Sequence, residues 1–131
     1  MNQRGFTWME LVMVVTVLVI LGAVAVPQYM DLQREARLAN EAGVVAGIRA
    51  GILTFFIDPV RGNRVHFPPT LDGAADGLCS PANPCFTNVL GQGGITELWI
   101  RLSMLNYRSP VNPTNIWTYN SLNGSFVQTA P

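Results

Sequence analysis

The sequence predicts an α+β protein, with one long N-terminal α-helix, half of it transmembrane, packed against a small C-terminal antiparallel β-sheet. Two observations predict the helix. Residues 11–28 carry no charge, and helical periodicity continues beyond them to about residue 57. A third observation predicts the sheet, because aromatic and β-branched residues flank Asn123-Gly124. That pattern is typical of a hairpin with a tight type I′ turn.

The composition excludes several classes of function. Acidic and basic residues balance at eight each in the 131-residue chain, so no net charge points to nucleic acid or to an acidic substrate. The chain has one His and no Gly-rich loop with phosphate-binding spacing, so no catalytic constellation emerges. We therefore expect a protein that is not an enzyme and that holds neither a metal nor a cofactor.

The apolar run 6–26 is interrupted only by Glu10. As a helix it would be about 31 Å long, close to the thickness of a bilayer core. Arg4 before the run, with little charge after it, fits a cytoplasmic N-terminus. The run could be a plain single-pass anchor, a signal peptide cleaved after Ala25, or a membrane helix kept after special processing. The signal peptide fits poorly, because the run is too long and an acid stands at its start.

The stretch Gly5-Phe6-Thr7-Trp8-Met9-Glu10-Leu11 resembles the type IV pilin superfamily, which includes type IV pilins and the pseudopilins of type II secretion. The signature of that superfamily is a short basic leader ending in Gly, then Phe-Thr, two apolar residues, Glu, Leu and a long apolar helix. Trp8 is bulkier than the aliphatic residue usual at its place. The resemblance covers about residues 1–57 and is weaker beyond them.

The resemblance implies a leader peptide, 1–5, that a prepilin peptidase removes between Gly5 and Phe6, and methylation of the new Phe6 amine. It implies that the helix 6–27 holds the subunit in inner-membrane lipid, with the N-terminus cytoplasmic and the head extracytoplasmic. An inner-membrane assembly platform would then build a helical filament from copies of the chain and related minor pilins. The filament would be an extracellular pilus or a periplasmic pseudopilus. The alternative functions are a membrane-anchored, monomeric extracytoplasmic binding domain and a secreted protein cleaved after Ala25.

In such a filament the resemblance places Glu10 opposite the Phe6 amine of a neighbouring subunit. A buried carboxylate and a buried cation are each costly, but together they offset part of each other's desolvation. Glu10 also lies near the positive end of the helix dipole. We expect the pair to set register and partner recognition more than stability. The alternative is that Glu10 only reaches toward the lipid headgroups.

Helical periodicity continues in an amphipathic segment, 28–57, beyond Pro27. Pro27 removes one backbone donor, so a kink is expected there, with added freedom at Gly22. One stripe of the segment is built of mostly small residues: Leu32, Ala36, Ala39, Gly43, Ala46, Ala50 and Leu53. A bulkier stripe holds Val44, Ile48, Ile52 and Phe55. The small stripe could pack on neighbouring subunits or lie under the chain's own sheet.

The segment 58–131 reads as a loop-rich globular head. Asp58 precedes a proline, which ends the helix, and the Pro- and Gly-rich stretch 58–94 predicts a long ordered loop with one short strand near 65–67. Three basic residues there are more typical of a solvated loop than of an anion site: Arg61, Arg64 and His66. Asp72 and Asp76 lack the run of oxygen ligands that calcium requires.

Cys79 and Cys85 enclose a short loop. Two Cys and one His are too few for a tetrahedral zinc site, so we expect a disulfide if this part lies outside the cytoplasm. Such a bridge would stabilise the fold by roughly 2.4 kcal/mol in the chain-entropy model. After it, five apolar residues fall at helical spacing, which predicts a short second helix over about 95–105: Ile95, Leu98, Trp99, Leu102 and Leu105.

Overall fold

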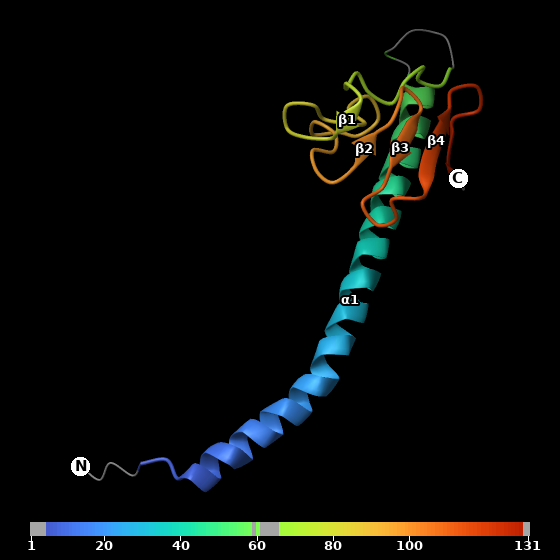
Figure 1. The fold of residues 1–131 in the computed structure, drawn as a ribbon. Coiled ribbons are helices and arrows are strands. Elements are labelled where there is room, and N and C mark those ends of the chain that lie inside the picture. Colours follow the sequence, from blue (N-terminus) through green and yellow to red (C-terminus); the bar gives the residue numbers. More distant parts are fainter. Residues whose placement is uncertain (1–4, 59, 61–65, 130–131) are drawn as a thin grey trace. The chain divides into compact units, whose positions relative to one another are not determined.

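The structure, a computed structural model, describes residues 5–58, 60 and 66–129. These residues contain one α-helix, α1 (Trp8–Ile57), and five strands. The strands are β1 (Gly77–Leu78), β2 (Ile100–Arg101), β3 (Asn106–Arg108), β4 (Ile116–Asn120) and β5 (Ser125–Thr129) (Figure 1). The chain divides into two compact units at Arg37–Leu38. We call the described residues of the first unit the stem and those of the second the head.

The helix α1 runs through both units. It begins one residue after Thr7, whose carbonyl accepts the first helical hydrogen bond from Leu11 at 3.1 Å. It ends at Ile57, just before Asp58, which stands before a proline and so disfavours helical backbone. The predicted long N-terminal helix is confirmed. The helix continues through Pro27, and the kink at Gly22 and Pro27 stays a prediction.

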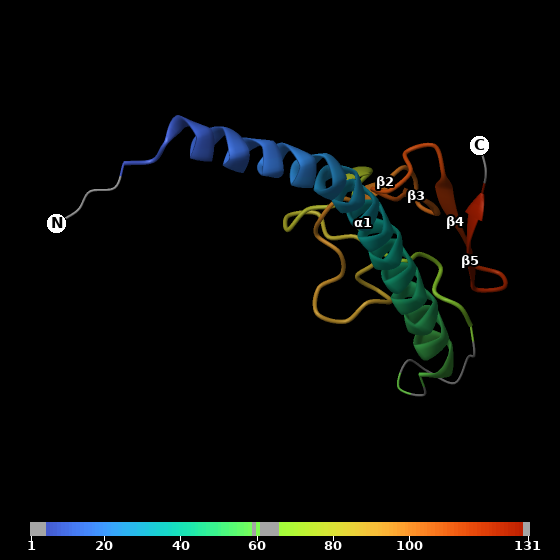
Figure 2. The same ribbon diagram turned by 90° about the horizontal axis from the view of Figure 1, so that it is seen from below.

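The five strands form one antiparallel sheet in the order β1-β2-β3-β4-β5. Figures 1 and 2 show it beside the part of α1 that belongs to the head. Alternate residues face the helix, and those that do so are buried: Arg101, Tyr107, Trp117, Tyr119 and Phe126. The predicted small antiparallel sheet is confirmed.

The core of the head is aromatic. From α1 it takes Val45, Ile48 and Ile52, all nearly inaccessible to solvent. Against them lies a cluster of rings, in which Phe86 is 4.3 Å from Tyr107 between centroids. The other large members of the core are Leu71, Trp99, Trp117, Tyr119 and Phe126. Rings of this size supply most of the buried apolar area in a head with short strands.

Polar contacts also fix the helix to the sheet. The Trp117 indole N–H donates to Glu41 at 2.8 Å. The Arg49 guanidinium donates twice to the Phe126 carbonyl, at 2.9 and 3.1 Å. These bonds are partly buried, and each involves a charged side chain. Such hydrogen bonds contribute more to stability than bonds between neutral groups. These two contacts join α1 to β4 and β5.

Three sequence-based expectations about the head are wrong. Residues 95–105 form no helix: Trp99 and Arg101 alternate inward, and Ile100–Arg101 pair as β2. The β4–β5 hairpin has a four-residue loop between paired Asn120 and Ser125, with only Gly124 at positive φ, so it is no two-residue type I′ turn. No strand includes 66–67, and Val65 lies outside the described residues.

Cys79 and Cys85 are joined by the predicted disulfide, with a Cα–Cα distance of 5.5 Å. Both residues are buried. Ser80 and Asn83 pair their backbones inside the loop. The bridge therefore closes a compact turn at the edge of the core.

Candidate functional site

Glu10 takes part in a capping box at the start of α1. Its backbone N–H donates to the Thr7 hydroxyl at 3.3 Å, and the Thr7 N–H donates back to the Glu10 carboxylate at 3.4 Å. Thr-x-x-Glu at a helix start satisfies two backbone donors that would otherwise lack partners. The sequence contains this signal, although the resemblance by itself pointed only to a contact between subunits. Glu10 thus has a role within its own chain.

The other residues of the predicted processing site lie just before this box. Gly5 and Phe6 precede the helix, and the Phe6 side chain is 71% exposed. In the full-length chain the Phe6 nitrogen is an amide, so the amine predicted to meet Glu10 exists only after cleavage. Arg4, the basic residue of the leader, lies outside the described residues. Cleavage and methylation at Phe6 stay predictions.

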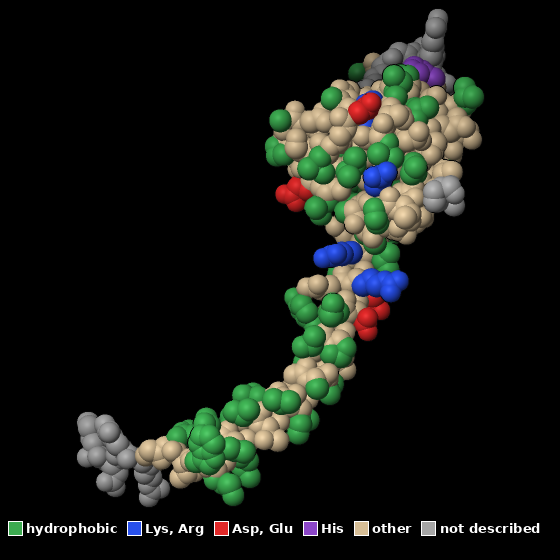
Figure 3. Space-filling model, viewed as in Figure 1, with side chains coloured by type: hydrophobic (Ala, Val, Ile, Leu, Met, Phe, Trp, Pro, Cys, Tyr) green, Lys and Arg blue, Asp and Glu red, His purple; other side chains and the backbone are tan. Residues whose placement is uncertain are grey.

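The stem exposes its apolar side chains. In the most hydrophobic part of α1 no residue is buried, and the helix is long and apolar enough to cross a membrane. Figure 3 shows hydrophobic side chains spread along this part of the chain. The Thr16 hydroxyl donates to the Val12 carbonyl at 2.7 Å, so it needs no outside partner. A surface of this kind is stable only in lipid or against other apolar surfaces.

The two stripes of the segment 28–57 are separated by the fold. The bulkier stripe meets the sheet, with Ile48 and Ile52 fully buried and Val44 and Phe55 partly so. Every member of the small stripe is exposed: Leu32, Ala36, Ala39, Gly43, Ala46, Ala50 and Leu53. The interpretation that placed this stripe under the chain's own sheet is therefore wrong. A row of small side chains lets a neighbouring helix approach closely.

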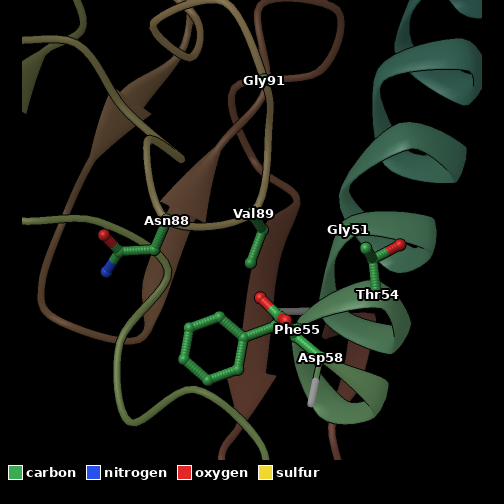
Figure 4. Close-up of a pocket in the computed structure, with 7 residues that line it drawn as sticks. All are labelled: Gly51, Thr54, Phe55, Asp58, Asn88, Val89 and Gly91. Atoms are coloured by element: carbon green, nitrogen blue, oxygen red, sulfur yellow. The ribbon is translucent and has the colours of Figure 1, made fainter. Parts of the chain in front are cut away.

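A hollow of about 310 Å³ lies in the head near the end of α1 (Figure 4). It lies between the last turns of the helix and the loop 88–91, and its lining is Gly51, Thr54, Phe55, Asp58, Asn88, Val89 and Gly91. Its polar groups are already bonded: the Thr54 hydroxyl to Ala50, and the Asn88 amide to Thr70. The hollow presents no cluster of acids, bases and nucleophiles suited to catalysis.

Asp72 and Asp76 bind an arginine. The buried Asp72 carboxylate lies 3.0 Å from Arg101 Nε and accepts hydrogen bonds from the Phe86 N–H at 2.9 Å and the Tyr107 hydroxyl at 3.0 Å. Asp76 pairs with the same guanidinium. Burial, with the Asp72 charge, raises the pKa of Tyr107. Within the described residues no group of three His, Cys, Asp or Glu side chains is placed to hold a metal.

Of the three basic residues of the predicted loop, the structure describes only His66. Arg61 and Arg64 lie outside the described residues. The His66 ring packs edge-on against Phe55, with centroids 6.2 Å apart.

Three features of the chain remain as candidates for a function: the capped acidic helix start, the exposed apolar stem and the exposed small stripe.

Comparison with known proteins agrees with these features. The chain is 27% identical over 88% of its length to a type IV major fimbrial protein, FimA, of Dichelobacter nodosus, and covers 69% of that protein. It is 34% identical over 58% of its length to a fimbrial protein of Moraxella nonliquefaciens. It is 40% identical over 38% of its length to the type IV narrow pilus major component PilA5 of Thermus thermophilus.

The chain covers less than half of the latter two relatives, 46% and 43% of their lengths. No family model and no solved structure gives a significant match. Three independent features nevertheless agree: the Gly-Phe-Thr-x-x-Glu start, the long helix on an antiparallel sheet, and relatives named as fimbrial and pilus proteins rather than as enzymes. In its helix start, its fold and its relatives, the chain is similar to the type IV pilin superfamily.

Proposed function

We propose that the chain is a structural subunit of a type IV pilus, assembled into a helical filament through α1 after cleavage at Gly5-Phe6 and methylation of Phe6. The observation that supports this proposal best is the outward-facing surface of α1. Its apolar stem and small stripe have no partner among the described residues of the chain itself. A surface repeated along one helix is suited to packing against identical helices.

The names of the relatives favour a pilus over a type II secretion pseudopilus, since the three described above are fimbrial or pilus proteins. Before assembly the stem would hold the subunit in the inner membrane, with the N-terminus in the cytoplasm. Prepilin peptidase, an assembly platform and minor pilins would be its partners. The disulfide fits a head that lies outside the cytoplasm.

In this function Glu10 acts twice. Before assembly its carboxylate caps α1 through Thr7. In the filament it pairs with the Phe6 amine of a neighbour, a cation that cleavage creates. The capping box holds the carboxylate at the helix start, so the acid is already positioned when the amine arrives. A preorganised charge loses less conformational entropy on binding.

The test compares three chains, each expressed as the only copy: the parent, Glu10→Ala and Glu10→Gln. Both variants should insert and be cleaved to a chain that begins at Phe6. Filaments recovered by shearing should fall sharply in both, because an uncompensated buried amine costs roughly 3–5 kcal/mol per contact. Glu10→Gln is the matched control, since its side chain can still cap the helix but cannot pair with a cation.

Two results would overturn the proposal. If mass spectrometry found a mature chain beginning at Val26, the apolar segment would be a signal peptide. If both variants were cleaved, present at the parent's level and assembled equally well, Glu10 would not be an assembly contact. The monomeric anchored domain would then be the better assignment.

A further inference from the structure

The outer face of the sheet carries one continuous row of side chains across all five strands. The register pairs Leu78 with Ile100, Ile100 with Arg108, Arg108 with Ile116, and Ile116 with Thr129. Residues directly opposite each other on one face lie about 5 Å apart at Cβ. Arg108 therefore stands between two isoleucines in the middle of the sheet. We call these five residues the Arg108 row.

Arg108 is an arginine without an acceptor. Its Nε atom is buried and has no hydrogen-bond partner, and no acid in the described part of the chain pairs with its guanidinium. The other described arginines of the head are engaged: Arg49 with the Phe126 carbonyl, and Arg101 with Asp72 and Asp76. The positive charge of Arg108 therefore has no counterion among the described residues of its own chain.

An acid without a partner projects from the loop before β2. Glu97 is exposed, and its carboxylate makes no hydrogen bond or ion pair with the described residues. The described acids elsewhere in the head all have partners. The next residue, Leu98, is 62% exposed and has a φ of 66°. A leucine in left-handed backbone is strained, and here the strain presents an apolar side chain to solvent. We call Glu97 and Leu98 the Glu97 knob.

We propose that the Glu97 knob of one copy binds the Arg108 row of the next copy in the filament. The carboxylate would pair with the guanidinium of Arg108, which no described acid of its own chain neutralises, since a guanidinium fork favours a carboxylate partner. Leu98 would cover the apolar surface of Ile100 and Ile116. The inference rests on the proposed function, because it names a contact between the heads of assembled subunits. It goes further by assigning that contact to two surfaces outside α1.

The two surfaces differ, so the contact is heterologous. Each copy would offer its knob to one neighbour and its row to another, and such a contact extends into an open chain instead of closing at a dimer. The charges are opposite, and each is unpaired within the described head. The contact therefore matches the symmetry of a helical filament.

Charge exchange tests the contact. Arg108→Glu and Glu97→Arg, each as the only copy, should lower filament recovery about ten-fold or more, as the loss of a close charge pair does. The double exchange should restore it. The control variant, Glu97→Arg with Ala82→Glu and Thr87→Glu, has the same net charge as the double exchange and places the new acids at two exposed positions that are not part of the row. It should not restore recovery, and equal recovery in the control and the double exchange would overturn the inference.

A second measurement does not depend on charge or on filament yield. Full-length chains carrying Glu97→Cys and Arg108→Cys are expressed together, one of them tagged, and treated in membranes and filaments with a short bis-maleimide. We expect a cross-linked pair of the two chains and no comparable product from Ala82→Cys with Arg108→Cys. Equal yields would refute the contact. If the parent chain formed filaments but the knob and row did not cross-link, this inference would fail while the proposed function stood; a parent without filaments would instead refute the function.

Discussion

At the scale of single residues, Asp72 holds the centre of the head. Its carboxylate accepts from the Phe86 N–H and the Tyr107 hydroxyl and pairs with Arg101, which is itself 9% exposed. Phe86 has a φ of 61°, so its backbone lies outside helix and strand geometry. Its N–H therefore relies on a side chain, that of Asp72, as its acceptor. The carboxylate thus organises the turn that places the Phe86 ring in the core.

Removing this carboxylate should be severe. Asp72→Ala would leave the Phe86 N–H and the Tyr107 hydroxyl without their acceptor and would leave Arg101 with Asp76 alone. Breaking a buried pair in this way costs about 3–5 kcal/mol. Asp76→Ala should cost about 1 kcal/mol or less, because the Asp76 side chain is 64% exposed. Denaturant unfolding of the detergent-solubilised chains, followed by tryptophan fluorescence, would measure both. Equal losses would show that Asp72 does not carry this role.

Gly51 permits a close approach between α1 and the loop 88–91. A Cβ at this position would lie 1.8 Å from the Val89 carbonyl oxygen. Gly51→Ala should therefore destabilise the head by several kcal/mol, since backbone and not a flexible side chain stands in the way. Gly43→Ala is the matched control, because nothing lies within 4 Å of that Cβ. Gly43→Ala should be neutral or stabilise the head by up to about 1 kcal/mol. Thermal unfolding of the two variants measures the difference, and equal unfolding temperatures would contradict the prediction.

At the scale of elements, the sequence identified the helix and the general place of the sheet. The apolar run and the periodicity after it are local signals, and α1 follows them from Trp8 to Ile57. The two-residue strands β1 and β2 gave no such signal. Their pairing is continued by a backbone hydrogen bond, in which the Cys79 N–H donates to the Trp99 carbonyl at 2.8 Å. Cys79 and Trp99 are far apart in the chain, so no local pattern predicts this contact.

The predicted second helix fails for a related reason. Ile95, Leu98 and Leu102 match a helical spacing, but Trp99 and Arg101 match the alternation of a strand equally well. Gly93 and Gly94, both at positive φ, bend the chain just before this segment, and Leu98 points to solvent. The ion pair between Asp72 and Arg101 could not be predicted either, because only the folded sheet brings these residues together. The Thr7–Glu10 capping box, by contrast, could have been predicted from four consecutive residues.

Strand β4 makes the head sensitive to alkali. Burial raises the pKa of Tyr119 to about 12, and its hydroxyl donates to the Pro68 carbonyl at 2.7 Å. In the unfolded chain the same phenol titrates near 10. The fold therefore favours the protonated phenol, and this stabilisation is complete below pH 10 and is lost as the pH rises from about 10 to 12.

The expected slope is roughly 1.4 kcal/mol per pH unit for each such tyrosine. Tyr107, whose pKa is also raised, adds to it. Free energies of unfolding, measured between about pH 9 and 12, should fall for the parent chain and fall less steeply for Tyr119→Phe. An unchanged slope in that variant would contradict the assignment to Tyr119.

At the scale of the whole molecule, the stability of the head and the proposed assembly would use different sides of α1. The bulkier stripe is covered by the sheet, and the small stripe is not. A change on the small stripe should therefore leave the subunit folded and yet prevent filaments, which separates the two properties in one experiment.

Ala46→Leu places a large side chain on the small stripe. The head should unfold at the parent's temperature, while sheared filaments should be reduced about ten-fold or more, because close helix packing tolerates only small residues. Asn40→Leu adds the same side chain at another exposed position, about a third of a turn away around the helix. It should assemble nearly as the parent does, and equal defects in the two variants would show that bulk alone matters.

The continuity of α1 has a mechanical consequence. A pull on the stem would reach the head along one uninterrupted helix, with no loop between them to extend first. The load would then pass into the sheet at Glu41–Trp117 and Arg49–Phe126, which lie about two turns apart on α1. Strands β4 and β5 would resist as a pair, since five residue pairs join them. A head stretched in this way should hold its core until these side-chain contacts fail together.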